Sequence, residues 1–123
     1  MKEKESRTAR IWLEDDGIVR YVSRGVPSTA DSVGESLRIV NELTGGKRVP
    51  ILFDSREWPR GDPASWVRFI SMIETVCLAA GVVANPESVK AMGRFPEFLD
   101  DLVIPFKIFE DEEDALSFLQ RQV

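Results

Sequence analysis

The sequence has no histidine and only one cysteine, Cys77. Without histidine the chain cannot form Ser-His-Asp or Cys-His catalytic groups, and it lacks the usual general base near neutral pH. A zinc site would also lack its ordinary ligands, which leaves only carboxylate sites for Mg²⁺ open, and we predict no cofactor. One cysteine excludes an internal disulfide and suits a reducing compartment, which predicts a cytoplasmic protein.

Long apolar runs and an excess of positive charge are missing as well. No run approaches the ~20 residues of a membrane span, and the first residues do not resemble a signal peptide. The net charge of −5 argues against nucleic acid or an anionic membrane as the main partner. We expect residues 1–7 to form a disordered tail and residues 8–123 to form a single α/β domain.

The sequence does contain the pattern of a mixed β-sheet. Residues 9–14 and 18–23 are predicted strands, and Asp15-Asp16-Gly17 between them suits a tight hairpin turn. Ser28 and Asp31 then have the spacing of a capping pair at the start of an amphipathic helix.

Strands and helices alternate along the rest of the chain. Apolar runs at residues 49–53 and 105–109, and one that ends at Ala84, predict three further strands. The boundary within residues 76–84 stays open, because periodicity cannot separate a buried helix end from a buried strand. The pattern predicts an α/β fold with a five-stranded mixed sheet, opened by the hairpin and covered by about four helices.

Three segments carry a family resemblance: Ile51-Leu52-Phe53-Asp54, the helix start at Asp62, and the acidic ending that follows Phe106-Lys107-Ile108-Phe109. Together they resemble the STAS fold of anti-sigma factor antagonists, which is SpoIIAA-like. They are still more similar to small bacterial proteins described as STAS or CRAL-TRIO-like, many of them uncharacterised.

The resemblance implies a regulatory protein, but one motif departs from the family. Partner-switching members carry Asp-Ser-Ser-Gly at the helix start, and a kinase that is also the binding partner phosphorylates the second serine. In this chain the motif falls on Asp62-Pro63-Ala64-Ser65, and Ala64 has no hydroxyl. We therefore expect the usual serine switch to be absent, with Ser65 or Ser55 left open as substitutes.

The candidate binding residues follow the ends of two predicted strands. Arginine and tryptophan are enriched at interface hot spots, and ligand sites gather past the carboxyl ends of parallel strands. The simpler interpretation assigns the same residues to helix caps and a solvated loop. The candidates are Asp54, Ser55, Arg56, Trp58, Arg60, Asp62, Ser65, Asn85 and Ser88.

Two functions fit these observations. The first is a non-catalytic regulatory or protein-interaction module that binds an unidentified protein partner, since no nucleophile has an adjacent base. The alternative is a module for a small apolar or anionic ligand or a lipid, with a pocket near residues 85–106, because the apolar material in residues 95–106 exceeds what a short helix needs. Tryptophans such as Trp12 or Trp58 could serve a homodimer.

Overall fold

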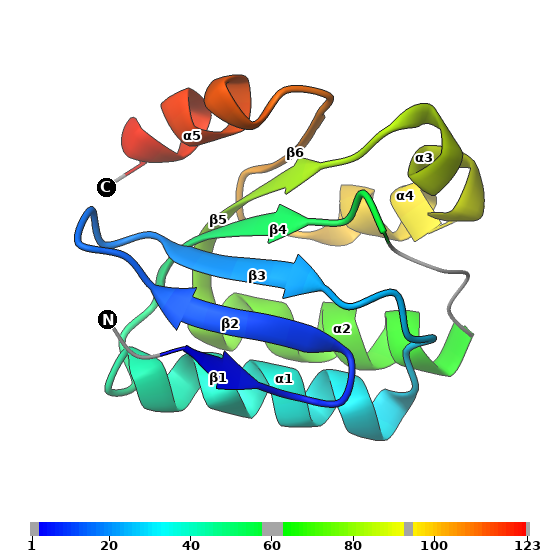
Figure 1. The fold of residues 1–123 in the computed structure, drawn as a ribbon, viewed down its shortest axis with the longest axis horizontal. Helices are drawn as coiled ribbons and strands as arrows, with labels where there is room; N and C mark the ends of the chain where they lie inside the picture. The colour runs from blue at the N-terminus through cyan, green and yellow to red at the C-terminus, as the bar shows by residue number, and fades with distance from the viewer. Residues whose placement is uncertain (1–2, 58–62, 93–94, 123) are drawn as a thin grey trace.

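A computed structural model describes residues 3–57, 63–92 and 95–122, and one sheet runs through them (Figure 1). Its six strands lie side by side in the order in which they occur along the chain. The first three strands pair antiparallel, and the last four pair parallel. They are β1 (Lys4–Glu5), β2 (Ala9–Leu13), β3 (Val19–Ser23), β4 (Val49–Asp54), β5 (Cys77–Val83) and β6 (Phe106–Phe109).

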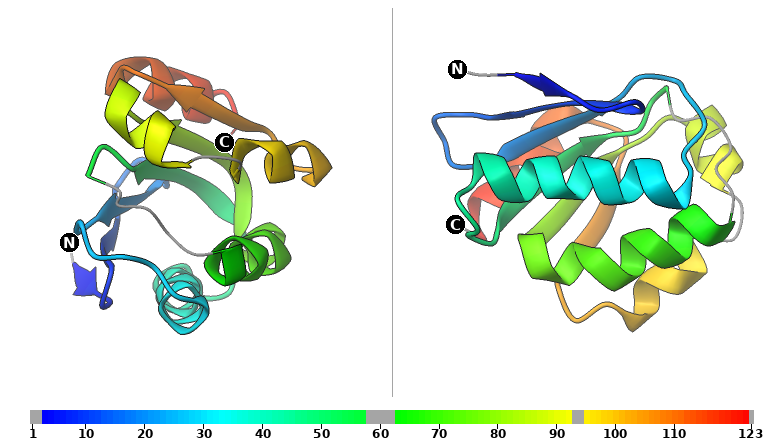
Figure 2. Two further views of the ribbon diagram at one scale, coloured as in Figure 1. Left: turned by 90° about the vertical axis from the view of Figure 1, so that its right-hand side faces the viewer. Right: turned by 90° about the horizontal axis from the view of Figure 1, so that it is seen from below.

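Helices cover both faces of the sheet unequally, because α1 and α2 pack side by side on one face and α5 lies on the other (Figure 2). Each crossover from β3 to β6 steps in the same direction, and right-handed crossovers of that kind cover a single face. The helix that follows β6 is not part of a crossover, so it is free to cover the other face of the sheet. The helices are α1 (Ala30–Leu43), α2 (Pro63–Val76), α3 (Pro86–Met92), α4 (Phe95–Phe98), the 3₁₀ turn η1 (Leu99–Asp101) and α5 (Glu112–Gln120).

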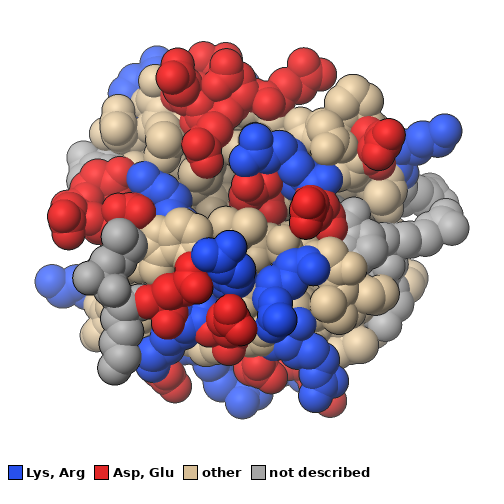
Figure 3. Space-filling model, in the orientation of Figure 1, with Lys and Arg blue, Asp and Glu red and all other residues tan. Residues whose placement is uncertain are grey.

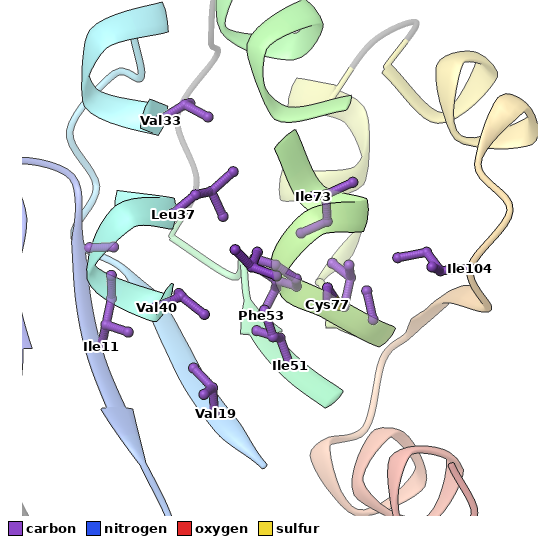
Figure 4. Packing of buried hydrophobic residues seen from close by; sticks show 14 of the residues in the cluster. Ile11, Val19, Val33, Leu37, Val40, Ile51, Phe53, Ile73, Cys77 and Ile104 are labelled. Atoms are coloured by element: carbon purple, nitrogen blue, oxygen red, sulfur yellow. The ribbon is translucent and has the colours of Figure 1, made fainter. Parts of the chain in front are cut away.

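Two apolar cores result from the alternation of side chains along the central strands. On β4, Ile51 and Phe53 face α1 and α2, whereas Leu52 faces α5. The larger core receives Leu37 from α1 and Ile73 from α2, and Figure 4 shows these side chains converging above the sheet. The smaller core holds α5 against β4 and β5.

The close approach of α5 depends on Gly81 in the middle of β5. A Cβ atom placed on this residue would lie 3.3 Å from Leu119 side-chain atoms and 3.5 Å from the carbonyl oxygen of Ala115. That spacing leaves little room for any larger side chain, so glycine lets the helix backbone come close to the strand.

Three expectations from the sequence need correction. The sheet has six strands, not five, because Lys4 and Glu5 pair with β2, and a disordered tail over residues 1–7 is therefore wrong for this stretch. The capping pair of α1 lies one residue later than expected. The Thr29 hydroxyl accepts from the backbone N–H of Ser32, and the Ser32 hydroxyl accepts from the backbone N–H of Thr29.

Other expectations are confirmed. The opening hairpin and the alternation of strands and helices are present, and four helices have seven residues or more within the described residues. The open boundary is resolved, since α2 ends at Val76 and Cys77 begins β5. In the described ranges, no helix combines the length and apolar character needed to cross a membrane.

Candidate functional site

The predicted site lies where the carboxyl ends of β3, β4 and β5 meet, beside α3 (Figure 1). At the end of β4, Arg56 donates to both carboxylate oxygens of Asp54, at 3.0 Å from Nε to Oδ1 and 2.6 Å from Nη2 to Oδ2. Partial burial works to raise the pKa of Asp54, but these bonds, a backbone bond and the arginine charge outweigh it and hold that pKa below its ordinary value. Asp54 is therefore an ionised partner of Arg56, a poor choice for a general acid or base at neutral pH.

The turn that follows β5 is hydrogen-bonded to the loop that follows β4. Asn85 and Ser88 cap each other, since the Ser88 amide donates to Asn85 Oδ1 at 2.8 Å and the Asn85 amide donates to Ser88 Oγ at 2.9 Å. The Asn85 side-chain amide also donates to the carbonyl of Arg56 at 3.1 Å. The amide of Ser55 donates to the carbonyl of Val83 at 2.8 Å. The two loops therefore form one polar surface.

The structure thus brings together Asp54, Ser55, Arg56, Asn85 and Ser88 from the predicted set. Ser65, 2% exposed, lies deeper, in the wall of a cavity that Asp54 and Ser55 also line. The remaining candidates, Trp58, Arg60 and Asp62, lie outside the described residues.

The cavity has a volume of about 80 Å³ and lies between the sheet and α2, partly open toward the carboxyl edge. Its lining combines an apolar interior with a rim of hydroxyl groups. Most of the apolar lining was absent from the predicted site. The lining residues are Thr8, Tyr21, Ser23, Ser28, Val33, Phe53, Asp54, Ser55, Ser65, Trp66, Phe69, Val82, Met92, Leu99, Phe106 and Ile108.

Aromatic rings form one continuous wall of this cavity. The ring centroids of Tyr21 and Phe53 are 4.9 Å apart, and Phe69 meets Phe53 edge-on at 5.5 Å. Phe69 also meets Phe106 edge-on at 6.5 Å. Such tilted and edge-to-face contacts favour a rigid wall, because each ring holds its neighbours in orientation.

A buried chain of hydroxyl groups stands behind Tyr21. Burial raises the pKa of Tyr21, and a hydrogen bond with Ser36 of α1 acts in the opposite direction. The Ser36 and Ser6 hydroxyl oxygens are 2.7 Å apart. The phenol therefore stays protonated and ties β3 to α1, which makes it a structural group at neutral pH.

A shallow groove continues from the mouth of the cavity across the polar surface. It is lined by Val22, Ser23, Asp54, Arg56, Glu57, Asn85 and Glu87, and it shares Ser23 and Asp54 with the cavity. A Cβ atom on Gly25, which adopts a positive φ of 76°, would lie 3.6 Å from the carbonyl oxygen of Glu57. The loops after β3 and β4 therefore meet at this groove.

The described residues provide no cluster of three or more histidine, cysteine, aspartate or glutamate side chains that could hold a metal ion. The one thiol is buried in the larger core, and its burial raises the pKa of Cys77 to about 12. Acidic side chains gather over the first turn of α5, where the helix dipole favours them, while acids and bases intermingle on the face around β2 (Figure 3).

Comparison with known proteins identifies a family and a fold. A family model described as "Domain of unknown function (DUF7793)" matches residues 11–123. Among solved structures, the chain is similar to an uncharacterised protein of the DUF3478 family from Shewanella loihica PV-4, which has a SpoIIAA-like fold. The two share 20% sequence identity with a TM-score of 0.67, over 97% of this chain and 98% of the other. No curated protein matches the chain. The SpoIIAA-like α/β fold expected from the sequence is therefore confirmed.

Proposed function

The chain belongs to the DUF7793 family, and we propose that it is a non-catalytic, cytoplasmic regulatory module that binds a protein partner through the carboxyl edge of its sheet. The observation that carries the proposal is the polar surface formed by the loops after β4 and β5. There, the Asp54–Arg56 ion pair and the Asn85–Ser88 turn hold two loops in a fixed arrangement. Fixed loops lower the entropy that binding a protein costs.

We further propose that the module works without the usual serine phospho-switch. Ala64, which stands where relatives of the partner-switching type carry the phosphorylated serine, is exposed. Its neighbour Ser65 is 2% exposed, so a kinase could not reach this hydroxyl without opening the start of α2. Of the two candidate hydroxyls, Ser55 is the more accessible, because it is only half-buried.

The size of the cavity supports a protein partner over a small-molecule or lipid ligand. Sites for small molecules enclose about 300–1,000 Å³, whereas this cavity holds about 80 Å³. A lipid chain or a nucleotide would not fit unless the surrounding helices moved.

Affinity purification from the source cells, followed by native mass spectrometry, tests the proposal. We expect the unmodified chain to retain a second protein and no small molecule. Arg56→Glu should weaken retention at least about tenfold, because it removes the bonds to Asp54 that hold the loop after β4 in its binding arrangement. Arg121→Glu, which makes the same charge change at the C-terminal end of α5, should retain the partner.

Equal retention of the partner by both variants would remove the carboxyl edge from the binding surface. Phosphate found on Ser55 or Ser65 in the purified chain would contradict the absence of a switch. A small molecule retained without any protein would favour the ligand-binding alternative.

A further inference from the structure

The cavity and the groove beside it together have the shape of a binding pocket for one side chain of a partner. The cavity is closed below by the aromatic wall of Tyr21, Phe53 and Phe69, and it opens beside Asp54 into the groove. An extended segment lying in the groove could therefore direct one apolar side chain downward between the sheet and α2. Buried pockets of this kind at the centre of an interface provide most of its binding energy.

The volume limits what this side chain can be. An apolar cavity of about 150 Å³ holds a benzene molecule, and the cavity here has about 80 Å³. The space therefore suits one compact apolar side chain, such as that of leucine, and is too small for an indole. The rim hydroxyls of Ser23, Ser28 and Ser55 lie where the backbone of such a segment would pass.

The charge around the groove favours a cationic neighbour for that side chain. Arg56 is paired with Asp54, so these two charges largely cancel. Glu57 and Glu87 are exposed, line the groove or its loops, and form no ion pair with any residue that the structure describes. The described residues of the groove therefore carry a net negative charge, and a lysine or arginine beside the inserted side chain would complement it.

We propose that this cavity is an anchor site for a partner protein: it takes one compact apolar side chain from a segment whose adjacent residue is lysine or arginine. The inference rests on the proposed function, because it assigns the partner's contact at the same edge of the sheet.

Amide NMR on the isotope-labelled full chain tests this proposal with defined probes. The peptide probe is acetyl-Leu-Lys-amide, and acetyl-Leu-Glu-amide has the opposite charge. Isoamylamine carries the same branched group on a cationic carrier without a peptide backbone. We expect shifts at cavity-lining residues for the lysine peptide at millimolar concentration, and at least about tenfold weaker binding for the glutamate peptide.

Matched variants separate the cavity from its surroundings. Because Leu99 lines the cavity, Leu99→Phe places a ring in that space. It should weaken binding of the lysine peptide at least about tenfold. Leu102→Phe makes the same change in a neighbouring residue that packs on the core without lining the cavity, and it should bind normally. The double variant Glu57→Lys with Glu87→Lys should bind the lysine peptide more weakly and the glutamate peptide more tightly. The double variant Glu110→Lys with Asp114→Lys should bind both peptides with unchanged affinity.

The proposal is overturned if no probe shifts the cavity residues, if the glutamate peptide binds as well as the lysine peptide, or if both leucine variants act alike. It is also overturned if isoamylamine binds as tightly as the lysine peptide, because the occupant would then be a free amine. None of these measurements needs an isolated partner. A negative result therefore removes the anchor site and leaves the purification experiment as a separate test of the regulatory module.

Discussion

At the scale of single residues, the carboxyl edge depends on a few polar side chains that fold back onto their own loops. Arg56 uses its guanidinium for Asp54 and its carbonyl for Asn85, so one residue links the loops after β4 and β5. The sequence indicated that these residues would be neighbours, because carboxyl ends of adjacent parallel strands meet at one edge. It could not indicate that Asp54 and Arg56 would bind each other, since that depends on side-chain conformation.

Asp54 should make stability depend on pH at the acidic end. Its folded-state pKa is lowered, so its contribution is full above the unfolded pKa of about 3.9 and is lost as the pH falls through the folded value. Asp54→Asn should lower the free energy of unfolding at pH 7 by up to about 1 kcal/mol, as for exposed ion pairs. It should also flatten the loss of stability below about pH 5.

Urea denaturation of both proteins between neutral and acidic pH measures this effect. Asp15→Asn is the matched control, because Asp15 is an exposed hairpin residue that forms no ion pair within the described residues. Parallel stability curves for the unmodified chain and Asp54→Asn at every pH would mean that the ion pair contributes nothing.

At the scale of elements, the pattern of apolar residues predicted those elements that bury a full face. Strand β1 escaped prediction because it is only two residues long and both, Lys4 and Glu5, are charged, so it has no apolar pattern. The cavity escaped prediction for a different reason. Its aromatic wall comes from β3, β4, α2 and β6, and each of those residues has the same pattern as an ordinary core residue. Apart from the predicted polar residues at its mouth, the apolar excess in residues 95–106 pointed toward the cavity, through Leu99 and Phe106.

The contact between α5 and β5 gives a prediction at this scale. Gly81→Val should destabilise the fold by about 1–3 kcal/mol, because its side chain would overlap Leu119 and push α5 away from the sheet. Urea denaturation measures this loss of stability. The single variant Leu119→Ala provides the reference, because it removes most of the Leu119 side chain from the contact between α5 and β5.

The double variant Gly81→Val with Leu119→Ala distinguishes overlap from other causes. If the introduced valine and the Leu119 side chain compete for the same space, the double variant will lose less stability than the sum of the two single losses. Additive effects would show that Gly81 is needed for the strand itself and not for the approach of α5.

At the scale of the whole molecule, the two cores share the same strands and cannot be separated. Leu52 lies between Ile51 and Phe53 on β4, so the residue that supports α5 is covalently flanked by residues that support α1 and α2. Loss of either core should therefore unfold the sheet as one unit.

Leu37→Ala in the larger core and Leu119→Ala in the smaller core test this coupling. Each buried leucine has no exposed surface, and each variant should lose about 2–5 kcal/mol. Circular dichroism, which follows the helices, and tryptophan fluorescence should give coincident unfolding curves for both variants. Separated curves for Leu119→Ala would instead show that α5 detaches while the rest of the sheet remains folded.

The sequential order of the strands has a consequence for how the chain reaches this structure during synthesis. No strand has to be inserted between two others, so the sheet can grow at one edge as each crossover leaves the ribosome. The second face stays uncovered until α5 is made, because α5 follows every described strand along the chain and packs over Leu52, Ala79 and Val83. The nascent sheet therefore exposes an aggregation-prone apolar surface until α5 emerges from the ribosome. Up to that stage a chaperone would protect the sheet most.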